Sequence, residues 1–291
     1  MNTSLDIVRC YGITKDPETN DFMMVMQYIE NGSLRQHLNK SFNSLNWESK
    51  LRNLIRIACG LTEIHENKLI HQDFHCGNIL CSSSFSYITD LGLCKPANVK
   101  PSQSGNKKIY GVLPYVAPEV LRGKEYTQAS DIYGFGIIAY EICTGLPPYH
   151  DIAHDEFLAA KICQGLRPNS NYKIPQLISD IIKQCWDADP LKRPNAEELD
   201  KLLHDLYNDA VNSLFSKQIK EADEVNDACH QHERANSFNK KLTSSSFTGI
   251  LSYTTHTQAV YTSRLLDFKN LPEPKNADDD DNLFATEYSG S

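Results

Sequence analysis

The sequence lacks long hydrophobic runs and long basic runs. No apolar stretch in its 291 residues approaches the roughly 18 residues that span a bilayer, and Met1–Cys10 has neither the basic start nor the apolar core of a signal peptide. Lys and Arg number 29 against 37 Asp and Glu, for a net charge of −8. We therefore predict a cytoplasmic protein that binds no membrane and no nucleic acid.

Closely spaced cysteine pairs are also absent. None of the nine cysteines belongs to a Cys-x-x-Cys pair, and their scattered positions favour reduced thiols over a disulfide framework. His71, His75, Cys76 and Cys81 lie near one another in the sequence, but the two cysteines do not match the spacing of a zinc site. We expect no metal to be bound by these four side chains.

The composition changes near residue 208. The preceding part alternates apolar runs with Gly, Pro and Asn, whereas residues 208–291 hold 8 basic and 13 acidic residues, with the runs Thr243–Ser246 and Asp278–Asp281. Such a composition is typical of a solvated segment. We predict a folded domain over residues 1–207 and an acidic, mostly disordered tail over residues 208–291. In an alternative view the tail is an interaction segment with phosphosites at 243–248.

Hydrophobic periodicity in the front part indicates one hairpin followed by helices. Ile7–Ile13 and Phe22–Tyr28 have the character of strands joined by a turn. An apolar stripe predicts a helix over Trp47–Asn67, and the almost wholly apolar run Ile132–Cys143 predicts a buried helix. Little sheet and many helices indicate an α+β fold with a helix-dominated lobe.

Two more helices are expected farther along the chain. Asn195 and Glu198 fit an N-cap with an acidic residue three positions on, and they open a helix whose stripe is Leu199, Leu202, Leu203 and Leu206. A thinner stripe of Ile219, Ala222 and Val225 indicates a charged helix over residues 215–242.

Two short motifs carry oxygen ligands suited to a metal ion and a phosphate. In the stretch Ile70–Leu80, Asp73 and Asn78 lie in a loop that contains Gly77. Asp90 follows 17 positions after Asp73 and is close to Gly92. Two carboxylates and an amide arranged in this way can surround Mg²⁺ and a phosphate. Alone, an Asp or Asn in a loop is more often a turn or capping residue.

The order of the motifs strengthens this interpretation. They are followed by Ala117-Pro118-Glu119, by Asp131 at the start of the buried helix, and by Lys192-Arg193-Pro194. In this set and order the chain resembles the eukaryotic protein kinases, most closely the tyrosine-kinase-like branch of the Ser/Thr kinases. The resemblance covers about residues 5–207. It implies a kinase-like α+β fold with a small-lobe remnant over residues 1–30, including a hairpin and a hinge, and a large lobe over residues 31–207.

The resemblance also implies an activity and its residues. It implies transfer of the γ-phosphate of ATP to Ser or Thr of a protein substrate, with Mg²⁺ as cofactor. Asp73 would accept the proton of the substrate hydroxyl, and Asn78 and Asp90 would be the Mg²⁺ ligands. The residues implied for nucleotide binding are the gatekeeper Met26, the hinge Gln27 to Ile29, and the apolar cover Leu80 and Val25.

Four further residues would be structural in such a protein. Glu119 and Arg193 resemble the buried ion pair that ties the activation segment to the late helices. His71 would pack beneath the catalytic loop, and Asp131, at the start of the buried helix, would have a structural role.

Several features depart from the family pattern. No Gly-rich phosphate loop, strand lysine or partner glutamate precedes Leu5. Gln72 stands where an arginine usually precedes the catalytic Asp, His75 where Ser/Thr kinases usually carry a lysine, and Val112 where they carry a threonine. Two hypotheses therefore stand together: a Ser/Thr kinase of which this chain lacks the front of the small lobe, and a pseudokinase or scaffold module without phosphotransfer.

Overall fold

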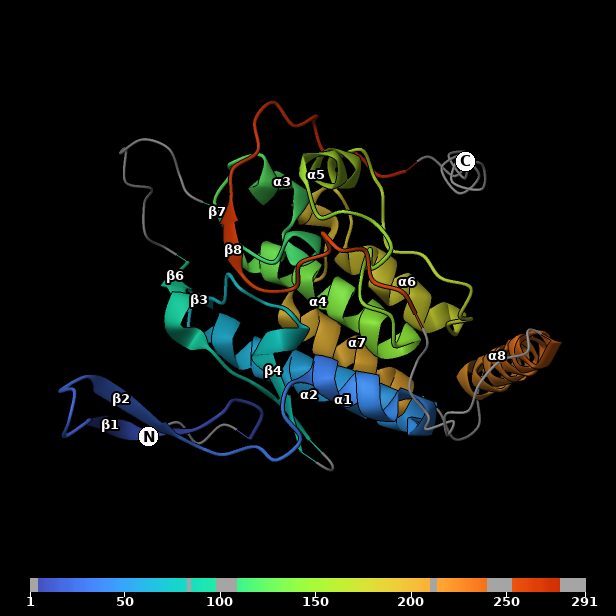
Figure 1. Cartoon of the computed structure of the whole chain (residues 1–291), viewed down its shortest axis with the longest axis horizontal. Coiled ribbons are helices and arrows are strands. Elements are labelled where there is room, and N and C mark those ends of the chain that lie inside the picture. Colours follow the sequence, from blue (N-terminus) through green and yellow to red (C-terminus); the bar gives the residue numbers. More distant parts are fainter. Residues whose placement is uncertain (1–4, 83–84, 98–108, 210–213, 240–252, 278–291) are drawn as a thin grey trace.

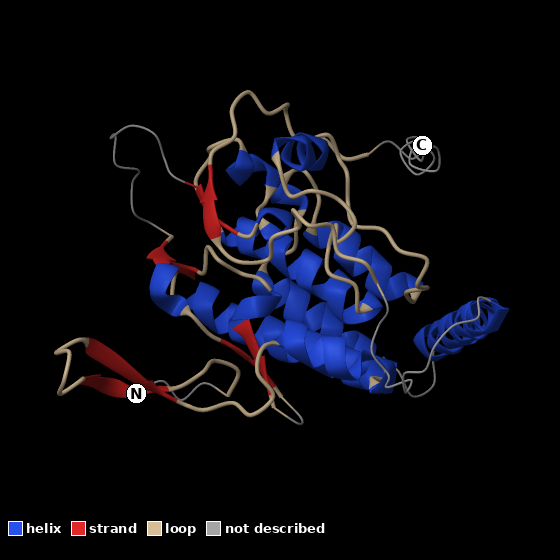
Figure 2. Ribbon diagram, in the orientation of Figure 1, coloured by secondary structure: helices blue, strands red, loops and turns tan. Residues whose placement is uncertain are grey.

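In the computed structural model, the described part of the chain comprises residues 5–82, 85–97, 109–209, 214–239 and 253–277. The phosphosites expected at 243–248 and the acidic run Asp278–Asp281 lie outside these residues. Figure 2 shows that helices dominate and that the strands are short. The prediction of an α+β fold with a helix-dominated lobe is confirmed.

The core of the lobe is built by helices with apolar stripes. Helix α2 (Trp47–Glu66) starts at the N-cap Asn46 and buries Leu51, Leu54, Ile55, Ala58, Leu61 and Ile64. Helix α4 (Gln128–Thr144) begins with a capping box at Thr127 and is buried along almost its whole length. The buried helix expected over Ile132–Cys143 is therefore part of α4, and the helix expected over Trp47–Asn67 is α2.

Further helices surround these two. They are α1 (Leu34–Ser41), α3 (Pro118–Leu121), α5 (Glu156–Cys163), α6 (Gln176–Cys185) and α7 (Ala196–Asp209). The predicted capping box of α7 is present, because the Glu198 amide donates to Asn195 Oδ1 and the Asn195 amide donates to Glu198 Oε2, each at 2.9 Å. One stripe residue was predicted wrongly, since Leu202 is 37% exposed while Leu199 and Leu203 are buried.

The expected hairpin forms near the start of the chain. Strand β1 (Cys10–Lys15) pairs antiparallel with β2 (Phe22–Met26). The hairpin extends from the side of the helical lobe in Figure 1. Its side chains are largely exposed, with Phe22 at 77% and Ile13 at 70%.

Three other short ladders organise the loops of the lobe. Strand β3 (Leu69–Ile70) pairs with β6 (Lys95–Pro96), and β4 (Ile79–Cys81) pairs with β5 (Ser86–Ile88). Strand β7 (Ile109–Gly111) pairs with β8 (Arg264–Leu266), which comes from near the end of the chain. All three pairings are antiparallel.

The division of the chain at residue 207 stays a prediction, but two parts of residues 208–291 differ from the expected solvated tail. Helix α8 (Leu214–Asn239) buries Phe215 and Ala222 on the lobe, while Val225 of its expected stripe is 46% exposed. Residues 253–277, here called the docked segment, run back over the lobe and include β8 (Figure 1). Leu266 of this segment is 3% exposed, so this side chain is packed on the lobe.

Within the described residues, we find no helix with the length and apolar character of a membrane span.

Candidate functional site

Asp131 fixes the loop after β3 through two hydrogen bonds to its backbone. Asp131 is 2% exposed, and its Oδ2 accepts a hydrogen bond from the His71 amide at 2.8 Å while its Oδ1 accepts one from the Gln72 amide at 3.1 Å. Gln72 has φ +71°, a left-handed conformation that costs a residue with a Cβ about 1–3 kcal/mol. The two bonds from Asp131 offset this cost and fix the backbone next to Asp73.

His71 connects this loop to the segment that carries Asp90. Its imidazole is fully buried, and Nε2 lies 3.1 Å from the carbonyl oxygen of Thr89. Burial lowers the pKa of His71 below its ordinary value even though Asp131 and Asp73 favour the charged form. The neutral ring donates its Nε2 hydrogen to Thr89, because a carbonyl oxygen can only accept.

The two expected Mg²⁺ ligands come from adjacent ends of one ladder. The pairing of Ile79 with Ile88 brings the preceding Asn78 beside Thr89, whose amide donates to the Asn78 carbonyl at 2.9 Å. Asn78 Nδ2 donates to the Asp73 carbonyl at 2.9 Å, which leaves the amide oxygen as a ligand. Asp90 is exposed and left-handed, with φ +58°.

An amide oxygen and an exposed carboxylate are hard ligands of the kind that Mg²⁺ binds. The donor set therefore fits the implied metal.

Asp73 lies at the centre of the site. Its Oδ2 accepts a hydrogen bond from Ser263 Oγ at 2.5 Å, and its Oδ1 lies 3.5 Å from His75 Nε2. Burial opposes ionisation of Asp73, but interactions with His75 and Ser263 outweigh it, so the pKa of Asp73 is lower than its ordinary value. The carboxylate is charged at neutral pH and can accept a proton from a hydroxyl.

His75 has a defined orientation. The Gly77 amide donates to His75 Nδ1 at 3.0 Å, so we assign the ring hydrogen to Nε2. A Cβ at residue 77 would lie 2.6 Å from His75 Cε1, which is why glycine is needed there. His75 therefore presents one N–H toward Asp73 and Ser263, whereas the lysine usual in this place would present a fixed charge.

The residues expected to bind the nucleotide base are only partly brought together. Ile29 is buried, and Leu80 forms a bridge with Ser33 just beyond the expected hinge. Met26 and Val25 lie on β2 with 39% and 46% of their surface exposed. The Gln27 amide donates to the Arg9 carbonyl at 2.8 Å, within the hairpin.

Glu119 and Arg193 form a bidentate ion pair beneath the site. The two nitrogens of Arg193 lie 2.8 and 2.9 Å from the two oxygens of Glu119. Arg193 also donates to the carbonyls of Ala129 and Asp187. The pair therefore joins α3 to the starts of α4 and α7.

Sequence reasoning missed the contribution of the docked segment. It did not single out Ser263 or Tyr261, although Tyr261 packs on the face of the Arg35 guanidinium, 4.2 Å from its centre. Arg35 is itself paired with Glu141 at 2.9 Å. A signal was present, since large apolar residues recur within an otherwise polar stretch: Tyr261, Leu265, Leu266 and Phe268.

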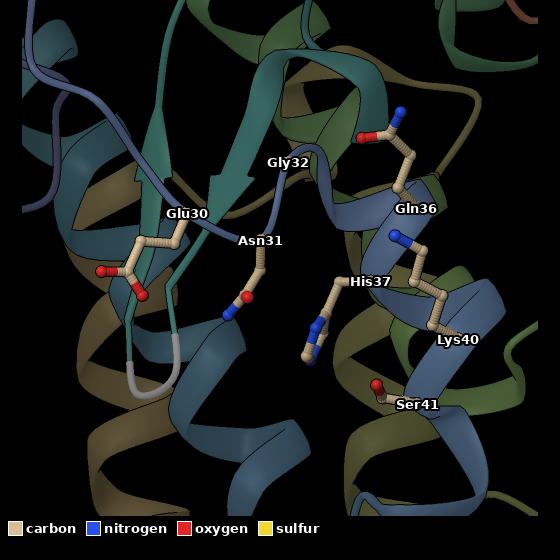
Figure 3. A pocket seen from close by; sticks show the side chains of 7 residues that line it. All are labelled: Glu30, Asn31, Gly32, Gln36, His37, Lys40 and Ser41. Carbon is tan, nitrogen blue, oxygen red and sulfur yellow. The ribbon is translucent and has the colours of Figure 1, made fainter.

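Two other features lie outside the predicted site. Figure 3 shows a polar pocket of about 400 Å³ between the segment after β2 and helix α1, lined by Glu30, Asn31, Gly32, Gln36, His37, Lys40 and Ser41. On α2 and α7, Cys59, Asp200 and His204 place three potential ligand atoms within 4.8 Å of one another. Burial raises the pKa of the Cys59 thiol to about 12, so the thiolate form that binds metals is disfavoured.

Comparisons with known proteins agree with the geometry. A family model described as protein tyrosine and serine/threonine kinase matches residues 2–203. The probable serine/threonine-protein kinase roco5 of Dictyostelium discoideum is 38% identical over 208 residues, 66% of this chain and 7% of the relative. The tyrosine-protein kinase SPK-1 of Girardia tigrina is 29% identical over 221 residues, 71% of this chain and 44% of the relative. The chain thus spans less than half the length of each.

Proposed function

The chain belongs to the protein tyrosine and serine/threonine kinase family, and on this premise we propose that it transfers the γ-phosphate of ATP to Ser or Thr side chains of protein substrates. The observation that carries the proposal is that the loop with Asp73 and Asn78 is joined to the segment with Asp90 by hydrogen bonds through His71 and Thr89. A charged base and two oxygen ligands are the groups that phosphoryl transfer needs.

Each side chain has a distinct task in this proposal. Asp73 orients the acceptor hydroxyl and takes its proton. Asn78 and Asp90 would hold Mg²⁺, which screens the charge of the phosphate oxygens when it is bound. His75 donates one hydrogen bond close to the acceptor oxygen. Because the transition state of phosphoryl transfer is loose, positioning and charge screening supply most of the rate.

The proposal favours Ser and Thr over Tyr for a geometric reason. The Ser263 hydroxyl, on one methylene carbon, already lies 2.5 Å from Asp73 Oδ2. If the backbone of a substrate lies where the backbone of Ser263 lies, the longer side chain of a tyrosine would place its hydroxyl beyond the Asp73 carboxylate.

A binding module without phosphotransfer is the second candidate. Val112 is 1% exposed and offers no hydroxyl beside Asp73, and His75 presents an N–H in place of a lysine charge. Both features weaken phosphate stabilisation, and they favour this alternative.

Two substitutions in the full-length protein separate the candidates. Asp90→Asn should weaken binding of Mg²⁺-ATP and abolish transfer, since it removes a metal ligand. Asp73→Asn should leave nucleotide affinity nearly unchanged and lower kcat by about 10² to 10⁴, as expected for loss of a group that acts on the proton in the transition state. Nucleotide titration and single-turnover transfer to a Ser/Thr peptide library measure the two effects.

The matched control is Asp205→Asn, which removes an exposed carboxylate on α7 and should change neither quantity. The kinase proposal is wrong if the wild-type protein transfers no phosphate, or if Asp90→Asn binds Mg²⁺-ATP as tightly as the wild type does.

A further inference from the structure

The docked segment passes directly over the catalytic loop. It starts near α1, where Tyr253 Oη donates to Asn39 Oδ1 at 3.0 Å, and ends near α6, where Asn276 Oδ1 accepts from the Ala188 amide at 2.8 Å. Between these two points lies β8, paired with β7 (Figure 1). A part of the chain thus occupies the surface beside Asp73, where a protein substrate would have to lie.

The ladder of β7 and β8 fixes the register of this segment. Gly111 pairs with Arg264, and Ile109 pairs with the buried Leu266. A slip by one residue would turn Leu266 to solvent. Ser263 immediately precedes the ladder, so its position opposite the catalytic loop is determined by backbone pairing.

A second anchor lies before Ser263. The Tyr261 ring packs on the Arg35 guanidinium, 4.2 Å from its centre, and contacts the His154 ring edge to face at 4.9 Å. The Tyr261 hydroxyl donates to the Pro148 carbonyl at 3.0 Å. One anchor on each side of Ser263 leaves its hydroxyl little freedom to move.

The polar contacts orient the hydroxyl as an acceptor. Ser263 Oγ lies 2.5 Å from Asp73 Oδ2 and 3.2 Å from His75 Nε2. Because His75 carries its hydrogen on Nε2, it donates to Ser263 Oγ, and the hydroxyl proton points to the carboxylate. A group that donates to a charged base and has a fixed oxygen is arranged as a nucleophile.

We propose that Ser263 is a phosphorylation site that the same chain modifies, and that Tyr261 to Leu266 is a peptide for which the substrate surface of this protein is built. The inference rests on the proposed kinase function and names a substrate for it. Recognition would require an aromatic residue two positions before the acceptor and an aliphatic residue three positions after it.

The chemical step is a single transfer. Ser263 Oγ forms a bond to the γ-phosphorus of ATP, and the bond from that phosphorus to the bridging oxygen breaks with its electron pair leaving on ADP. Asp73 takes the hydroxyl proton. The product carries a phosphate next to the charged Asp73, so like-charge repulsion should loosen the docked segment.

Mass spectrometry of the full-length protein tests the inference. After incubation with Mg²⁺ and ATP, phosphate should be found on Ser263, and the initial rate per molecule should not change on dilution, since the acceptor is part of the same chain. Ser263→Ala should lose this phosphate. Thr262→Ala, which removes the neighbouring exposed hydroxyl, should keep it at the wild-type rate.

A parallel assay with a Ser/Thr peptide library separates the two proposals. If the protein phosphorylates library peptides but Ser263 carries no phosphate, this inference alone is overturned. If the rate of Ser263 phosphorylation per molecule falls on dilution, modification by the same chain is overturned. Absence of transfer to either substrate overturns the kinase function and this inference together.

Discussion

The two sides of the loop that carries Asp73 differ in how completely the chain covers them. On the side of β7, Val112 and Leu266 are 1% and 3% exposed, and the docked segment fills the surface. On the side of the hairpin, Phe22 and Met24 are 77% and 60% exposed. The docked segment therefore covers the side of β7, whereas apolar side chains of the hairpin stay exposed.

This difference indicates which interactions contribute most to the free energy of unfolding. Buried charges and hydrogen bonds lie on the side of β7, and removing one partner there leaves the other unsatisfied in a poorly solvated place. Replacing an exposed apolar residue of the hairpin should change the free energy of unfolding little. Matched substitutions on the two kinds of surface should therefore have unequal effects.

The largest effect on stability is expected for the buried ion pair. Arg193→Leu leaves the Glu119 carboxylate uncompensated and should lower the free energy of unfolding by about 3–5 kcal/mol. The matched control is Arg52→Leu, which removes an exposed partner of Glu48 on α2 and should cost only about 0–1 kcal/mol. Urea unfolding of the three proteins measures the difference, and equal losses would contradict the comparison.

Short motifs, interpreted through the family resemblance, predicted the ion pair of Glu119 and Arg193, and local spacing predicted the capping box of Asn195 and Glu198. The motifs around Asp73, Asp90 and Glu119 are short, and the capping box of Asn195 and Glu198 lies within one helical turn. The burial of stripe positions at the edge of a helix face depends on the neighbouring element, which local spacing does not specify. Leu202 and Val225 are exposed for this reason.

The docked segment could not be predicted in the same way. Its pairing joins residues 109–111 to residues 264–266, and such a distant contact leaves no period in the sequence. The acidic composition of residues 208–291, averaged over the whole stretch, also concealed the short cluster around Tyr261 and Leu266. Composition measures mean solvation, whereas docking depends on a few side chains.

A smaller effect is expected from truncating one tyrosine on each side. Tyr261→Ala removes a cation–π contact and a hydrogen bond, together worth about 1–3 kcal/mol, so the docked segment should open about 5- to 150-fold more often. Tyr11→Ala in the hairpin, where Tyr11 is 65% exposed, should change this opening little. Hydrogen exchange of the β8 amides measures the opening.

Equal exchange in the wild type and in Tyr261→Ala would show that this ring is not an anchor. Faster exchange in Tyr11→Ala as well would show that the two sides of the site are coupled, and the comparison between them would then fail.

The smallest effect is a change in the pH dependence of stability caused by His71. The folded state holds the pKa of His71 below its ordinary value of 6.5, because burial outweighs the attraction of Asp131 and Asp73 and adds to the repulsion of His75. As the pH falls below about 6.5, His71 is protonated in the unfolded chain before it is protonated in the folded protein. The contribution of His71 to the free energy of unfolding is therefore complete above this pH and decreases as the pH falls toward the pKa of the folded state. The slope cannot exceed about 1.4 kcal/mol per pH unit for one proton.

Two variants isolate this proton from the hydrogen bond to Thr89. His71→Gln can still donate to the Thr89 carbonyl, and His71→Phe cannot, so the two should differ in stability at neutral pH. Neither side chain titrates, and both variants should lose the same part of the wild-type slope in urea unfolding between about pH 7.5 and pH 5. If both keep the full wild-type slope, His71 is not the group that titrates, and the acid sensitivity of the site must come from another buried side chain.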